Sequence, residues 1–124
     1  MLASRFLRLS VIYALIGIAL GIVIAATRDL SQMPTHAHIN LLGFVAMAIY
    51  GFFYRLYPAA EAGWMAPAHF WIANLGFVAL MACVAAAHGG YELAEEGAKV
   101  FSLVVIAGMA LFAVIVFRAT ARPA

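Results

Sequence analysis

Two histidines separated by one residue form the clearest candidate site in the sequence. His36 and His38 lie in the run from Pro34 to Gly43. We expect both about one turn inside a helix, because proline suits a first-turn position, where its missing N–H would have no partner. Imidazole coordinates iron or copper in its neutral form, which suits a ligand inside a membrane. The pair therefore predicts an iron or copper site.

The spacing limits what this pair can do. Residues two apart on an α-helix differ in direction by about 200°, so His36 and His38 point to nearly opposite faces. One metal cannot be held by both from the same helix, so they serve different neighbours, or only one is functional. Asn40 and Gly43 continue the face that begins at His36, and we include both among the candidate cofactor contacts.

Glycines clear space on two of the predicted helices. Gly43 and Gly51 leave gaps on an otherwise bulky helix, and in a membrane such gaps admit a neighbouring helix backbone or a flat cofactor. Gly17 and Gly21 form a G-x-x-x-G pattern, which favours close helix packing. These positions therefore indicate tight contacts on both helices.

The other histidines and the single cysteine give weaker signals. His88 lies at a predicted helix end and is interpreted as interfacial; alternatively, it joins His36 and His38 across copies in a copper or zinc site. His69 lies just inside a predicted helix start, where we expect an interfacial or capping residue. Cys83 has no partner in the chain, which excludes an intramolecular disulfide and a Cys-based metal site.

The composition excludes a soluble globular protein. Hydrophobic residues make up 68% of the 124 residues, charged residues make up 10%, and the mean hydropathy is +1.07. Apolar runs long enough to cross a bilayer predict transmembrane helices at residues 9–26, 36–57, 68–88 and 98–117. We therefore expect an all-α integral membrane protein, with residues 1–124 forming a single up-down four-helix bundle in the lipid bilayer.

Basic residues are unevenly divided between the two sides of such a bundle. The side with both termini carries Arg5, Arg8, Arg55, Arg118 and Arg122, and the other side carries Arg28 and Lys99. This excess predicts cytoplasmic termini. His36, His38 and His88 then lie near the outer surface, and His69 lies near the inner surface. The net charge of +2 comes from these flanking residues, so it does not indicate a nucleic-acid partner.

The second predicted helix is similar to a helix of a known enzyme family. The run His36-Ala37-His38, with Gly43, Gly51 and the ending Tyr54-Arg55-Leu56-Tyr57-Pro58, resembles the H-x-H helix of heme-copper oxidase and nitric oxide reductase catalytic subunits. In that family the first histidine binds the high-spin heme iron and the second binds the low-spin heme iron. His38-Ile39-Asn40 also resembles the H-x-N of another ligand helix in the family, so the match is open between two family helices.

The resemblance extends to an assembly. The family's catalytic subunit has twelve helices in three pseudo-equivalent arcs of four, and this chain resembles one arc. The resemblance thus implies a homotrimer that forms an oxidase-like ring in a bacterial inner (cytoplasmic) membrane. It also implies a b-type heme at each subunit interface, held by His38 of one copy and His36 of the next, with Arg28 near the propionates. The expected role is electron transfer with an unknown redox partner, or handling of nitric oxide or oxygen.

The chain departs from the family in proton chemistry. No Lys or carboxylate lies in the middle of a predicted span, so a proton-pumping oxidase is not expected. A cofactor-free assembly or scaffold protein that packs through its glycines is an alternative. A small transporter is a further alternative, although transporters usually place a charge near the midplane, which this chain lacks.

Overall fold

The computed structural model describes residues 1–121, and Arg122 therefore lies outside the described residues. Its elements are α1 (Leu2–Thr27), α2 (Met33–His38), the π-helix η1 (Ile39–Ala46), α3 (Met47–Leu56), the 3-10 helix η2 (Pro58–Glu61), α4 (Met65–His88) and α5 (Leu93–Thr120). Residues 1–121 contain no strand, which confirms the all-α class. The segments α2, η1 and α3 follow one another without interruption and act as one long helix.

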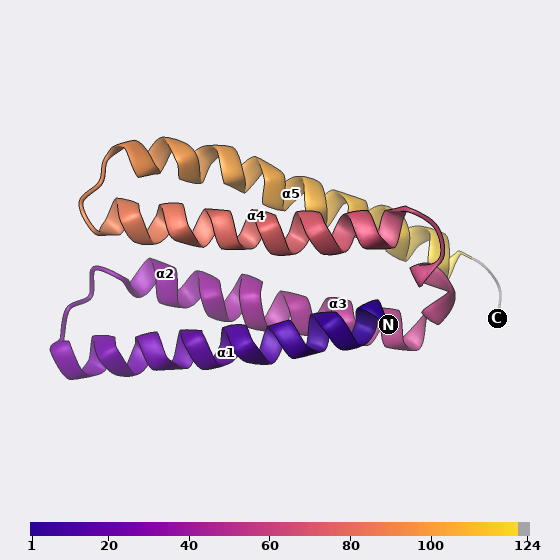
Figure 1. Cartoon of the computed structure of the whole chain (residues 1–124), viewed down its shortest axis with the longest axis horizontal. Helices are drawn as coiled ribbons and strands as arrows, with labels where there is room; N and C mark the ends of the chain where they lie inside the picture. The colour runs from indigo at the N-terminus through magenta and orange to yellow at the C-terminus, as the bar shows by residue number, and fades with distance from the viewer. Residues whose placement is uncertain (122–124) are drawn as a thin grey trace.

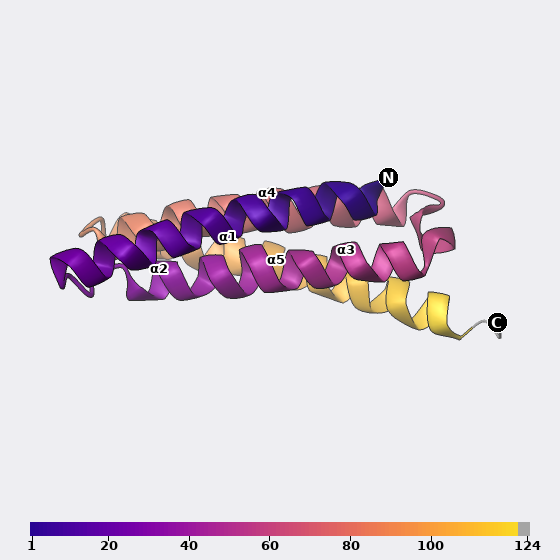
Figure 2. The ribbon, with the colours of Figure 1, turned by 90° about the horizontal axis from the view of Figure 1, so that it is seen from below.

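The fold consists of two antiparallel helical hairpins that pack against each other as a bundle. Figure 1 shows α1 running antiparallel to the α2–η1–α3 helix, and α4 running antiparallel to α5. Figure 2, a view from below, shows that α1 lies next to α4, while α3 and α5 share the other layer. The start of α1 and the end of α5 therefore lie at the same end of the bundle, as an up-down arrangement requires.

The two ends of the bundle differ in the polar residues that they carry. We call one end the histidine end, because His36 and His38 at the start of the second long helix and His88 at the end of α4 lie there. We call the opposite end the arginine end. It carries the basic residues Arg5, Arg8, Arg55 and Arg118.

The four predicted spans are present, but every helix is longer than expected. Helices long and apolar enough to cross a membrane cover Leu2–Thr27, Met33–Leu56, Met65–His88 and Leu93–Thr120. The predictions of residues 9–26, 36–57, 68–88 and 98–117 started each helix three to seven residues late. Hydropathy marks the apolar part of a helix, whereas Arg and Glu beside that part are good helix formers and continue α1 and α5. The second long helix and α4 start early because Pro34 and Pro67 are tolerated in a first turn. Four such helices fit a multi-pass membrane protein.

Besides the buried contact between Tyr54 and His69, two polar contacts join the first hairpin to α4. The Tyr13 hydroxyl of α1 donates to Asn74 Oδ1 of α4 at 3.0 Å. Beside the start of α2, Gln32 Nε2 donates to the Ala85 carbonyl of α4 at 3.1 Å. Because hydrogen bonds between helices have few competitors inside a membrane, these two contacts help to fix the position of α4 against the first hairpin.

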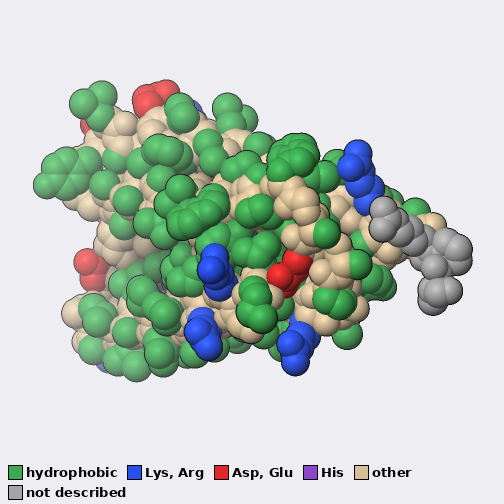
Figure 3. Space-filling view, turned by 45° about the vertical axis from the view of Figure 1, so that its right-hand side comes forward, with side chains coloured by type: hydrophobic (Ala, Val, Ile, Leu, Met, Phe, Trp, Pro, Cys, Tyr) green, Lys and Arg blue, Asp and Glu red, His purple; other side chains and the backbone are tan. Residues whose placement is uncertain are grey.

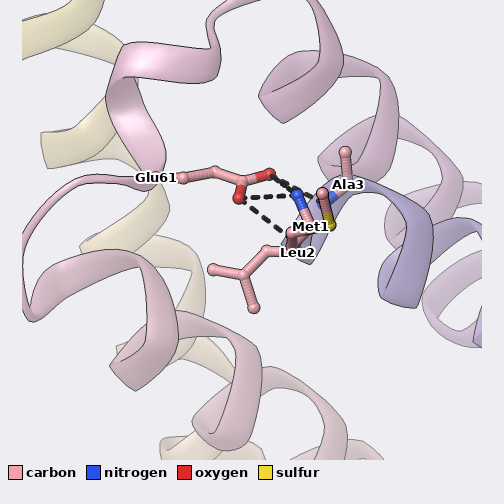
Figure 4. A network of polar contacts seen from close by, with 4 residues as sticks. All are labelled: Met1, Leu2, Ala3 and Glu61. Atoms are coloured by element: carbon pink, nitrogen blue, oxygen red, sulfur yellow. Dashed lines mark hydrogen bonds and ion pairs between the residues drawn. The ribbon is translucent and has the colours of Figure 1, made fainter.

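Glu61 closes the arginine end by binding the start of α1. Its carboxylate accepts hydrogen bonds from the Leu2 and Ala3 N–H groups at 3.1 and 3.0 Å, and its nearest contact with the Met1 amino group is 2.9 Å (Figure 4). The first N–H groups of a helix have no partner within the helix, and the helix dipole favours a negative charge there. Glu61 therefore acts as a cap supplied from a distant part of the chain.

We predict that Glu61→Gln lowers the stability of the bundle by about 0.5–2 kcal/mol, the range for loss of a helix cap. Partial burial alone would raise the pKa of the Glu61 carboxyl, but hydrogen bonds from Ala3, the Met1 amino group and Leu2, with the charge of that group, hold this pKa below its usual range. The carboxylate thus contributes stability above an ordinary carboxyl pKa, and this contribution is lost as the pH falls through the lowered value.

Thermal unfolding in detergent from pH 7 down to acid checks this prediction. The difference between wild type and Glu61→Gln should be largest near pH 7 and should shrink as the carboxylate is protonated. Glu92→Gln provides a control, because Glu92 is an exposed residue at the opposite end of the bundle. A difference between wild type and Glu61→Gln that does not change with pH would contradict the role of the charge.

Candidate functional site

His38 lies on the outside of the second long helix with one ring nitrogen fixed and the other free. Its Nδ1 is 2.6 Å from the Pro34 carbonyl oxygen, one helical turn earlier. A carbonyl oxygen only accepts hydrogen bonds, so Nδ1 carries the proton and Nε2 keeps its lone pair. In metal-binding histidines, the ring nitrogen that does not coordinate usually donates its N–H to a nearby oxygen in this way. His38 therefore presents Nε2 as a ligand atom.

An apolar groove begins at His38. It runs between the two hairpins and has a volume of about 320 Å³. Its walls come from the second long helix, α4 and α5: His38, Leu42, Leu80, Ser102, Val105, Ile106 and Met109. The groove therefore combines one nitrogen ligand with the hydrocarbon walls that a flat, mostly apolar cofactor needs.

His36 faces the other way and packs into α1. Its Nδ1 is 2.8 Å from the Gly17 carbonyl oxygen, which fixes the same tautomer as in His38. A Cβ atom at Gly21 would lie only 2.6 Å from His36 Cε1, and a Cβ atom at Gly17 would lie 2.9 Å from the Asn40 amide group. The G-x-x-x-G pattern does give close packing, as predicted. The space over these two glycines is filled by the side chains of His36 and Asn40.

Asn40 holds His36 in place. Its Nδ2 donates to the His36 carbonyl at 2.9 Å and lies 3.3 Å from His36 Nδ1. Its amide also fills the space over Gly17. Asn40 is therefore a positioning residue for His36.

These contacts place the two histidines on different faces of the second long helix, as their spacing predicts. His36 faces α1, and His38 faces the groove beside α4 and α5. The face that starts at His36 continues through Met47, Tyr50 and Tyr54, all of which are buried. The face that starts at His38 continues through exposed residues: Val45, Ile49 and Phe52.

The gap at Gly43 is filled within the chain. An added Cβ atom would lie 2.6 Å from Phe77 Cζ of α4 and 2.9 Å from Tyr13 Cβ of α1. The gap is therefore occupied by side chains of two neighbouring helices, and not by the helix backbone that was expected there. A cofactor would contact Gly43 only if Phe77 moved away.

The π-helix η1 directly follows His38 and includes Asn40 and Gly43. A π segment replaces the usual i to i+4 hydrogen bonds with i to i+5 bonds, and such segments are often found at functional sites. No residue pattern in the sequence indicates it. The segment changes the direction of the residues after His38, so the 3.6-residue period describes this stretch only approximately.

His88 and Arg28 are two further polar residues at the histidine end. His88 Nδ1 is 2.9 Å from the Val84 carbonyl oxygen, so its Nε2 is also free. Arg28 caps α1 in a left-handed conformation with φ 56°, and its side chain is exposed in the connection to α2. Within residues 1–121 no three His, Cys, Asp or Glu side chains come together to hold a metal. The alternative copper or zinc site is therefore not formed by one chain.

Lys99 is a second cation at this end that sequence reasoning left out of the site. It lies about one turn before Ser102, one of the residues that line the groove. Its ammonium pairs with Glu96 at 2.6 Å, and both side chains are exposed. Lys99 is thus an exposed cation about one helical turn from the lining of the groove.

His69 is the main residue that sequence reasoning placed wrongly. It was expected at the interface or as a helix cap, but its exposed fraction is 0%. Its Nδ1 is 2.9 Å from the Tyr54 hydroxyl, and its Nε2 is buried without a hydrogen-bond partner in the described chain. The ring stacks on Phe112 at a centroid distance of 5.0 Å and meets the Tyr50 ring edge-on at 4.6 Å.

This buried pair lies in an aromatic cluster to which all four long helices contribute. Phe6 comes from α1, Tyr50 and Tyr54 from α3, His69 from α4, and Phe112 from α5. The cluster forms the packed core of the arginine half. The residues next to His69, Pro67 and Phe70, do not indicate that it is buried. Its burial depends on helices that are distant in the sequence.

We predict that Gly21→Ala displaces His36. The added methyl group would overlap His36 Cε1, so the ring must turn and lose its hydrogen bond to Gly17, at a cost of about 1 kcal/mol. Nitrogen-15 NMR of the imidazole in detergent should show loss of the fixed Nδ1–H tautomer. Ala19→Val is the control, because residue 19 is exposed on the same helix. An unchanged His36 tautomer in Gly21→Ala would contradict the predicted displacement.

Comparison of the chain with protein-family models, curated proteins and solved structures gave no match.

Proposed function

We propose that this protein binds a b-type heme at its histidine end and uses it in electron transfer or in handling a small gas such as nitric oxide or oxygen. The observation that carries the proposal is the His38 ring, whose Nδ1 is tied to the Pro34 carbonyl and whose Nε2 is free beside an apolar groove. Heme supplies an iron that changes its charge by one electron or binds a diatomic gas. The chain would supply the axial ligand, the apolar walls and the cations.

The residues fit a heme on one side of the second long helix only. His38 and the groove offer a ligand and hydrocarbon walls, with Lys99 and Arg28 as candidate partners for the propionates. Inside the bundle there is no comparable space, because Phe77 fills the gap at Gly43 and the aromatic cluster surrounds His69. The proposal therefore places the heme between copies of the chain and not inside one copy.

The second axial ligand would come from His36 of a neighbouring copy in a homotrimer. Two observations support this choice. His36 and His38 cannot reach one iron from the same chain, because they face α1 and the groove respectively. Both have the Nδ1–H tautomer, which leaves Nε2 without a proton, although the His36 ring would have to turn away from Gly21 to reach an iron outside its own chain. Two histidine ligands would saturate the iron, which favours electron transfer over gas chemistry.

The test is the absorption spectrum of the detergent-purified protein, produced with added heme, first oxidised and then reduced with dithionite. Sharp reduced α and β bands are expected for two histidine ligands and electron transfer. A broad high-spin spectrum that shifts with carbon monoxide or nitric oxide would support the gas-handling branch with a single ligand. A colourless protein without metal in elemental analysis would overturn the proposal and favour a cofactor-free scaffold protein.

A complementation experiment tests the position between subunits. His36→Ala and His38→Ala chains carrying different tags are produced together and purified through both tags in sequence. If one heme takes its ligands from two copies, the mixed oligomer recovers complete sites that neither variant forms alone. Absence of any low-spin heme in the mixed oligomer would contradict the arrangement between copies.

A further inference from the structure

A pocket at the arginine end is separate from the histidine site. Its volume is about 410 Å³, and it lies between the end of α3, the connection through η2, the start of α4 and the end of α5. Most of its lining is apolar, and one residue carries a charge: Leu56, Tyr57, Pro58, Ala59, Ala60, Ala62, Met65, Ile115, Arg118 and Ala119. The pocket thus joins hydrocarbon walls to a single guanidinium group.

The charges at this end leave Arg118 without an anionic partner in the described chain. Glu61 lies at this end, but its carboxylate already accepts hydrogen bonds from the start of α1 and pairs with the Met1 amino group. Within residues 1–121 the ion pairs are Met1 with Glu61 and Lys99 with Glu96, so Arg5, Arg8, Arg55 and Arg118 form none. Figure 3 shows Lys and Arg side chains spread around this end, with apolar side chains between them.

Arg118 itself has a weak partner. Its Nη1 donates to Met65 Sδ at 3.4 Å, and the thioether sulfur is a poor acceptor for a guanidinium group that has five N–H donors. Arginine matches the oxygen atoms of a phosphate with two parallel hydrogen bonds. The Arg118 side chain is exposed, so an anion from outside the protein has access to it.

We propose that this pocket binds an anionic glycerophospholipid, with the phosphate on Arg118 and an acyl chain along the apolar walls. The lining residues Leu56 and Tyr57 are exposed, so an acyl chain from the surrounding bilayer has access to them. Basic pockets between transmembrane helices are recognised sites for anionic lipid head groups. A free phosphate would use the guanidinium but leave the apolar walls exposed, so the lining favours the lipid.

Native mass spectrometry of the delipidated protein in detergent tests the proposal. Phosphatidylglycerol and phosphatidylcholine are added in equal amounts, and we expect at least tenfold preferential retention of phosphatidylglycerol by the wild type. Arg118→Gln should abolish this preference. Arg8→Gln is the matched control, because it removes one positive charge at the same end outside the pocket and should keep the preference.

Two further measurements distinguish a lipid-binding pocket from non-specific attraction of anionic lipids to the basic residues. Ala119→Trp fills the pocket without changing the charge, and we expect it to abolish the preference as Arg118→Gln does. Inorganic phosphate at millimolar concentration should leave phosphatidylglycerol bound. Equal losses in Arg118→Gln and Arg8→Gln, unchanged retention in Ala119→Trp, or displacement by inorganic phosphate would each overturn the proposal. Circular dichroism of each variant confirms that it is folded.

Discussion

Replacing His38 by alanine should lower the heme bound per chain by at least tenfold. The variant removes the one imidazole in the groove lining, and what remains offers the iron only the Met109 thioether, which already accepts a hydrogen bond from the Tyr50 hydroxyl. The side chain is exposed on the outside of its helix, so its removal should change the stability of the bundle by less than about 0.5 kcal/mol. Pyridine hemochrome assay against protein concentration measures the ratio.

Two other histidine variants give this experiment its controls. His88→Ala removes an imidazole with the same type of Nδ1 contact, from a helix end outside the groove, and should retain the heme. His36→Ala removes the proposed second ligand and should convert the spectrum from low spin to high spin or lower the heme content. Equal heme content in His38→Ala and wild type would contradict the assignment of the ligand.

The largest stability effect is expected at His69. His69→Ala would leave a cavity where four helices meet and would deprive the buried Tyr54 hydroxyl of its partner. Removal of a ring from a packed core typically lowers the free energy of unfolding by about 3–5 kcal/mol. We therefore expect His69→Ala to unfold at a much lower temperature than the wild type in detergent, or to be recovered from the membrane in low yield.

Variants that keep the rings separate packing from hydrogen bonding. Tyr54→Phe leaves the buried Nδ1 of His69 without its partner and should cost about 1–3 kcal/mol. The double variant Tyr54→Phe/His69→Phe removes both polar partners and also the orphaned Nε2, so it should be close to the wild type in stability. Additive losses in the double variant would show that the hydrogen bond does not couple the two residues.

Much of the fold follows from the sequence because the bilayer sets the length of an apolar run. Four such runs predict four spans, and the short connections force neighbouring helices to run antiparallel. The helix ends were less accurate, since charged flanks such as Arg5 and Arg8 continue a helix as readily as apolar residues do. The Glu61 cap could not be predicted, because it joins segments 58 residues or more apart.

The candidate site was predictable where it depends on one helix and not where it depends on several. The opposite directions of His36 and His38 follow from helical geometry alone. The contacts of His36 with Gly17 and Gly21, the filled gap at Gly43 and the buried position of His69 depend on how α1, α4 and α5 pack on that helix. A pattern within one segment carries no information about such neighbours.

Titration of heme into the apo protein in lipid nanodiscs tests the central claim most directly. The Soret absorption is followed for the wild type and for His38→Ala. We expect the wild type to saturate at one heme per chain, with the low-spin spectrum of two histidine ligands, and His38→Ala to show only the unsaturable partitioning seen in empty nanodiscs. Identical unsaturable curves for both proteins would contradict heme binding through His38.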